Sequence, residues 1–217
     1  MALLTLLPTR LLACLLGVAA FAVLGVVTAR AALPPEPNPI PIRWQLDLDV
    51  GPLQVASVES ADQGPMLYYF MTYTVTNNTD EDILLAPSFE LATETGVNVV
   101  AGQGVPAGVT RELLGRLGNP LLNDQVNMIG VLRRGEAYAR EGLVIWPVKD
   151  ITADEARVYM AGFSGETARI EVIDRESGNP RDVVLRKTLM AVHDVPGNID
   201  GLPGRPLERT ESRWIMR

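Results

Sequence analysis

Hydrophobic and polar residues follow two different patterns along the chain, and the pattern changes near residue 42. The first is an uncharged apolar run from Leu11 to Ala29, which as a helix would cover most of a hydrocarbon core of roughly 30 Å. The second is a series of short stretches in which apolar and polar positions alternate, as in half-buried strands. The sequence therefore predicts an N-terminal hydrophobic helix followed by an all-β domain.

The apolar run fits two interpretations. Its length favours an uncleaved membrane anchor, whereas the small residues between Ala29 and Ala32 favour cleavage of a signal peptide. Arg10 and Arg30 flank the run almost symmetrically, so charge bias does not orient a span. We assign residues 1–31 to a signal peptide or an uncleaved membrane anchor. Either way, we expect the rest of the chain to be extracytoplasmic, periplasmic or secreted, with attachment to the membrane if the run is retained.

Residues 32–42 are predicted to form a linker. Prolines stand at positions 34, 35, 37, 39 and 41, and they favour the extended polyproline II conformation, which rises about 3.1 Å per residue. We interpret the segment as a stiff spacer in front of a single domain at residues 43–217.

The domain is predicted to be built from strands. Alternation is clearest from Arg43 to Val50, and it places Trp44, Leu46 and Leu48 on one face. The aromatic and β-branched residues of segment 67–77 suit a central strand. Further strands are expected at 83–86, 88–93, 142–146, 157–163, 168–173, 183–192 and 213–216. The turn-forming residues between 173 and 183 predict a hairpin.

One connecting helix is expected between Ala107 and Leu117. Leu113, Leu114 and Leu117 have helical spacing, and Gly118 supplies a stop signal. Many short strands with one short helix favour a β-sandwich of the immunoglobulin-like kind.

Three segments carry a resemblance to other proteins. They are Tyr73–Thr79, the stretch from Leu84 to Gly96, and Val158–Glu166. The chain from Trp44 to Arg217 resembles a group of uncharacterised exported bacterial proteins with an immunoglobulin-like β-sandwich domain. The resemblance implies that fold, and it implies no catalytic or binding residues.

Charge and cysteine content narrow the chemistry. Removing Arg10 and Arg30 from the 19 basic residues, with all 26 acidic residues retained, leaves a net charge of −9 from Ala32 onward. Such a charge disfavours nucleic acid as a partner. Cys14 is the only cysteine and lies in the apolar run, so the domain has no disulfide, cysteine nucleophile or thiolate metal site. We expect no cofactor.

Two groups of residues are weak candidates for ligand binding. The first contains hard oxygen ligands in one turn, which suit calcium: Asn78, Asp80, Glu81 and Asp82. The second contains aromatic rings that, if exposed, could stack on a sugar: Tyr68, Tyr69, Tyr73 and Trp146. The alternative for each group is structural, a polar turn for the first and core packing for the second.

Catalytic candidates are poor. His193 is the only histidine, and Asp194 beside it points to the opposite face of a strand. Ser164 lacks the second glycine of a nucleophile elbow, because Glu166 stands in its place. Asp47 and Asp49 share a strand face and have a spacing compatible with paired carboxylates.

These observations favour a non-enzymatic exported or membrane-tethered domain that binds a protein or an envelope component. A carbohydrate-binding module is the alternative interpretation, and a carboxylate-dependent hydrolase is the third.

Overall fold

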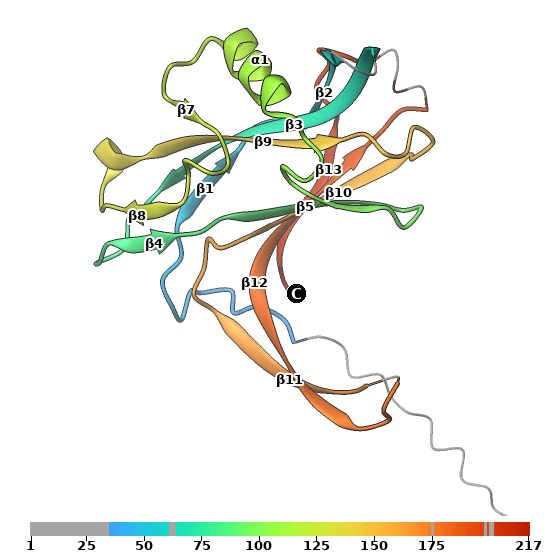
Figure 1. The fold of residues 1–217 in the computed structure, drawn as a ribbon. Coiled ribbons are helices and arrows are strands. Elements are labelled where there is room, and N and C mark those ends of the chain that lie inside the picture. Colours follow the sequence, from blue (N-terminus) through green and yellow to red (C-terminus); the bar gives the residue numbers. More distant parts are fainter. Residues whose placement is uncertain (1–34, 61–63, 175, 198, 200–201) are drawn as a thin grey trace, which may run out of the picture. The chain divides into compact units, whose positions relative to one another are not determined.

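The computed structural model describes residues 35–60, 64–174, 176–197, 199 and 202–217. The predicted helix within residues 1–31 lies outside this range. Within it the chain is mostly β, with two large sheets that pack face to face in a sandwich-like arrangement and a small two-stranded sheet beside them (Figure 1). None of the helices in the described ranges is long and apolar enough to cross a bilayer.

The first large sheet is organised around β3 (Gly64–Thr76). On one side β3 pairs with β9 (Arg140–Pro147), and β9 pairs in parallel with the short β7 (Leu122–Asn123). On its other side β3 pairs with both β1 (Asp47–Val50) and β2 (Gln54–Ser60). Gly51, Pro52 and Leu53 separate β1 from β2, and the Gly51 N–H still donates to the Thr72 carbonyl at 2.9 Å. The two strands therefore follow one edge of β3 with a break between them.

The second large sheet is organised around β12 (Pro180–Asp194). The C-terminal half of β12 pairs with β10 (Glu155–Ala161) and with β13 (Arg209–Met216). Next to β10 lie β5 (Ser88–Thr93) and then β6 (Asn98–Val100). The N-terminal half of β12 pairs with β11 (Thr167–Ile173), which forms the predicted hairpin. The small sheet joins β4 (Ile83–Leu85) to β8 (Gly130–Leu132).

The main core lies between the inner faces of the two large sheets. β3 contributes Tyr73 and β5 contributes Phe89, whose ring centroids are 4.7 Å apart. Phe163, which follows β10, packs edge-on against both rings. This aromatic cluster joins the sheets at a point where all three rings are almost completely buried.

A second, smaller core lies on the outer face of the β2–β3–β9 sheet, under helix α1 (Ala107–Leu117). Figure 1 shows α1 across these strands, on the side away from β5 and β10. Val109 and Leu113 of the helix pack against Tyr68 and Phe70 of β3. The helix ends at Gly118, which has a φ of 63° and donates its N–H to the Leu114 carbonyl, as expected for a left-handed stop residue. The predicted helix is confirmed at these residues.

The predicted first strand begins later than expected. Leu46 and Val50 are buried as the alternation indicated, but β1 starts at Asp47. Before it, the Leu46 N–H donates to the Phe163 carbonyl and the Gly165 N–H donates to the Trp44 carbonyl, both at 2.9 Å. Residues 44–46 therefore cross toward the segment after β10 and do not extend β1.

Candidate functional site

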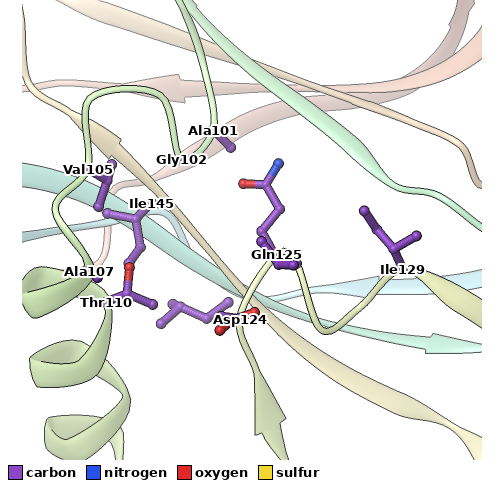
Figure 2. A pocket seen from close by; sticks show the side chains of 11 residues that line it. Ala101, Gly102, Val105, Ala107, Thr110, Asp124, Gln125, Ile129 and Ile145 are labelled. Atoms are coloured by element: carbon purple, nitrogen blue, oxygen red, sulfur yellow. The ribbon is translucent and has the colours of Figure 1, made fainter.

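An open pocket lies on the outer face of β9, beside helix α1. Its volume is about 470 Å³, within the roughly 300–1,000 Å³ of small-ligand sites. Leu143 and Ile145 of β9 line it, as do Ala107 and Thr110 at the start of α1. Figure 2 shows Ala107, Thr110 and Ile145 on one side of the pocket and Gln125 and Ile129 of the 124–129 loop on the other. Leu143 and Ile145 belong to the same small core as Val109 and Leu113 of α1, so the pocket lies at the border of that core.

The loop that forms the opposite wall is held in place by its own contacts. Asp124 accepts hydrogen bonds from the backbone N–H of Asn127 at 2.8 Å and from its side-chain amide at 3.1 Å. Met128 is completely buried in the main core. Arg140 donates to the carbonyls of Met128 and Val131. The loop is therefore anchored at its centre and at its end.

Anchoring Met128 leaves its neighbours exposed. Val126 is 76% exposed and Ile129 is 57% exposed, although both are large and apolar, and both line the pocket. Val131 of β8 and Leu84 of β4 lie directly opposite each other and are also exposed. We call Val126 and Ile129, which both line the pocket, the apolar rim. An exposed apolar group next to a concave apolar pocket is typical of a binding surface.

The polar groups of the pocket are few. Thr110, Asp124 and Gln125 line it, and the other lining residues are apolar or glycine. The Oε1 atom of Gln125 lies so close to Gly102 that a Cβ there would be 3.0 Å from it. The pocket therefore offers apolar contact with a hydroxyl, a carboxylate and an amide at its edge.

The four calcium candidates do not converge on one point. Asn78 donates to Oδ2 of Asp47 at 2.7 Å, and Asp82 accepts from the backbone N–H of Arg134. Asp80 contributes its carbonyl to the Arg134 guanidinium, and Glu81 offers its carbonyl to Asn77 and Thr79. Among the described residues, no three or more histidine, cysteine, aspartate or glutamate side chains are arranged to hold a metal ion. The turn is instead tied together by its own hydrogen bonds.

The four aromatic candidates are buried. Tyr68, Tyr69, Tyr73 and Trp146 are each at most 2% exposed. Burial, with the nearby carboxylates of Asp150 and Glu94 as smaller causes, raises the pKa of Tyr69 to about 12. Burial alone raises the pKa of Tyr68 and of Tyr73. Stacking on a sugar requires an exposed ring face, so these four rings do not form a platform in this structure.

The catalytic candidates are also separated from one another. His193 is completely buried, and neither of its ring nitrogens has a hydrogen-bond partner among the described residues. Ser164 accepts a hydrogen bond from the Glu166 backbone in a turn. Asp47 and Asp49 are exposed on β1, and Asp47 is bonded to Asn78. No described contact joins these residues into a catalytic arrangement.

Comparisons with known protein families, with curated proteins and with solved structures found no match. The pocket itself was not predicted from the sequence. Its residues come from four separate segments: 101–107, Thr110, 124–129 and the β9 pair of Leu143 and Ile145. The only local signal is that Val126 and Ile129 are apolar residues in a segment rich in turn formers.

Proposed function

We propose that this chain is an exported or membrane-tethered, non-enzymatic domain of immunoglobulin-like kind that binds a protein of the cell envelope. We further propose that the pocket beside α1 holds an apolar side chain of that protein, with the apolar rim forming the surrounding contact.

The observation that carries this proposal is the combination of pocket and rim. The pocket is concave and lined mainly by apolar groups, and Val126 and Ile129 extend its apolar surface outward while being more than half exposed. Burying an exposed apolar side chain stabilises a complex by roughly 25 cal/mol per Å². An anchor residue in a pocket, surrounded by further apolar contact, is the usual arrangement at a protein interface.

The polar edge of the pocket supports a protein ligand. Thr110 and Gln125 can each donate and accept a hydrogen bond, which matches the peptide groups on either side of an anchor side chain. The buried positions of the four aromatic candidates remove the feature that favoured a carbohydrate ligand.

The test is site-specific photo-crosslinking in the full-length chain, in cells that normally express it. A photoreactive residue at Val126 should form one reproducible crosslinked protein, whereas the same residue at Ile151, which is 59% exposed and is not among the residues that line the pocket, should not. Thr110→Trp should fill the pocket and abolish the crosslink. Arg111→Trp adds the same group to an exposed position of α1 and should leave the crosslink intact.

The two tryptophan variants make the result decisive. Loss of the crosslink with Thr110→Trp alone would show that the pocket is occupied by the partner. Equal crosslinking from Val126 and Ile151, or no effect of Thr110→Trp, would contradict the proposal.

A further inference from the structure

Among the described residues, the β11–β12 hairpin has a free edge and an apolar face that is only partly buried. β11 is the last strand of its sheet, and it pairs only with β12 among the described strands. In Figure 1 the hairpin extends beyond the two packed sheets, and no residue of β11 is fully buried. A two-stranded hairpin on its own is marginally stable, so this arm lacks the covering that the rest of the fold has.

The backbone groups at the free edge can be assigned. At the ends of the hairpin, the Lys187 N–H donates to the Glu166 carbonyl at 3.0 Å and the Asp174 N–H donates to the Asn179 carbonyl at 2.9 Å. Because backbone groups alternate sides along a strand, the even-numbered residues of β11 are directed to β12. The N–H and C=O groups of the odd-numbered residues therefore face the open edge: Thr167, Arg169, Glu171 and Ile173.

The edge lacks three of the features that commonly protect a sheet from pairing, namely a proline, a lysine and a bulge, and its charged residues are Arg169 and Glu171. β11 contains no proline or lysine, and its register with β12 is continuous from Thr167 to Ile173, so it has no bulge. Natural edge strands are commonly protected by one of these features.

We propose that β11 pairs with β11 of a second copy of this chain, in an antiparallel register centred on Ile170. In this register Arg169 of each copy lies opposite Glu171 of the other, so two pairs of opposite charge form at once. Their backbone groups are the ones that face the open edge, so the same pairs form the new ladder of hydrogen bonds.

Charge selects this register over its neighbours. Moving the centre of the register by one residue, to Arg169 or to Glu171, still joins the outward-facing backbone groups. These registers, however, place Arg169 opposite Arg169 or Glu171 opposite Glu171. Opposite charges across a strand pair are stabilising, and like charges directly opposite each other are destabilising. Of these three registers, only the one centred on Ile170 avoids both like-charge pairs.

In a single chain, two negatively charged side chains of the hairpin lie side by side, and a second copy brings a positive charge to one of them. Within the hairpin, Glu171 lies directly opposite Asp182, so two carboxylates are neighbours on one face. Pairing brings Arg169 of the second copy to the other side of Glu171.

The apolar face of the hairpin, opposite to the face that carries Arg169 and Glu171, becomes one continuous surface across the two copies in the dimer. Ala168, Ile170 and Val172 share this face with Val183 and Leu185 of β12. A second copy extends the two strands to four, with the two Ile170 side chains adjacent at the centre. Three or more strands with a hydrophobic face are needed for independent stability.

The test uses the full-length chain with Cys14→Ser, so that an introduced cysteine is the only thiol. Ile170→Cys should form a disulfide-linked dimer on mild oxidation, because residues directly opposite in a non-hydrogen-bonded pair have Cα atoms about 4.5 Å apart. Glu176→Cys, on the exposed turn of the same arm, measures random collision.

Charge reversal provides an independent measurement. Arg169→Glu and Glu171→Arg should each weaken self-association about tenfold in analytical ultracentrifugation, because each places like charges opposite each other twice. The double variant exchanges the two charges and should restore association. The proposal is overturned if the chain is monomeric at all concentrations, if Ile170→Cys crosslinks no faster than Glu176→Cys, or if the double variant associates no better than the single ones.

Discussion

The Nζ atom of Lys187 lies 3.0 Å from Oε2 of Glu166, and both side chains are at least 96% buried. Asn38 completes the arrangement, since its N–H and side-chain amide donate to Oε1 of Glu166 and its carbonyl accepts from Lys187. Burial by itself would raise the pKa of the Glu166 carboxyl, but the bonds from Asn38 and Lys187 outweigh it and hold this pKa below its ordinary value. Asn38, which belongs to the proline-rich segment, is therefore bound to Glu166 and Lys187 at the start of the β11–β12 hairpin.

Removing one charge of this pair should be strongly destabilising. Lys187→Met leaves the Glu166 carboxylate buried without its cation, and breaking a buried pair in this way costs about 3–5 kcal/mol. Urea unfolding should show the loss as a lower midpoint with an unchanged slope.

Two further variants test whether this loss of stability comes from the unpaired buried charge. The Lys187→Met, Glu166→Leu double variant removes both charges and should recover much of the loss, because an apolar pair can replace a buried ion pair. Arg157→Met breaks the exposed pair with Glu155 and should cost less than about 1 kcal/mol. Equal losses from Lys187→Met and Arg157→Met would show that the buried pair has no special importance.

The buried histidine should make stability depend on pH. Burial and the nearby positive charge of Arg209 lower the pKa of His193 from 6.5 to about 4. The Ala156 peptide opposes this shift, although neither ring nitrogen makes a hydrogen bond of normal geometry. Between pH 6.5 and 4 the unfolded chain binds more protons at this residue than the folded chain, so stability falls as the pH falls.

The expected contribution of His193 is a loss of about 3 kcal/mol between pH 6.5 and pH 4. Unfolding free energies measured across this range for the wild-type chain and for His193→Leu give the contribution as their difference. The leucine variant lacks the titrating group, so its stability should decline less in acid. Parallel pH profiles for the two proteins would contradict the prediction.

The same glycine-to-alanine change should have opposite effects at two positions. At Gly142 in β9, a Cβ would lie 2.5 Å from the ring of the buried Tyr73, so Gly142→Ala should cost about 1–3 kcal/mol through overpacking. At Gly115 in α1 nothing lies within 4 Å of the added Cβ, and alanine should stabilise the helix by about 0.5–1 kcal/mol. Thermal unfolding of the two variants should shift the midpoint in opposite directions.

Local sequence patterns predict the elements whose start, end and buried face are encoded in their own residues. Helix α1 was predicted at its observed residues because its leucine spacing and Gly118 are both local signals. β2 is absent from the predicted strands because its adjacent apolar residues lie on opposite faces: Val55 faces the main core, whereas Ala56 and Val58 face α1. Such neighbours interrupt the simple alternation expected of a half-buried strand.

The candidate site is harder to predict for a different reason. The pocket is lined by residues of α1, β9 and two loops, and the apolar rim depends on Met128 being buried in the core while Val126 and Ile129 stay exposed. Both are consequences of packing between distant segments. Tyr68 and Tyr69 show the converse case, since they are adjacent in sequence but lie in different cores, which follows from the alternation of side chains along a strand.

Asn77 should be the most sensitive polar residue of the turn between β3 and β4. It is completely buried, and its amide donates to the carbonyls of Glu81 and Leu132 at 2.9 and 3.0 Å. Its Oδ1 accepts from the N–H and the hydroxyl of Thr79. Asn77→Ala would remove the buried bond to the Leu132 carbonyl, whereas the Glu81 carbonyl keeps its bond from the Thr79 hydroxyl, and the loss should cost about 1–3 kcal/mol.

Asn78 provides the matched control, because it is the neighbouring asparagine and is exposed, with one hydrogen bond to Asp47. Asn78→Ala should change the unfolding free energy by less than about 0.5 kcal/mol. Asn77→Asp keeps the acceptor but replaces the donor with an oxygen that repels the two carbonyls, so it should be at least as harmful as alanine at neutral pH. If Asn77→Asp is instead as stable as the wild-type chain in urea unfolding, the amide bonds to Glu81 and Leu132 do not hold this turn.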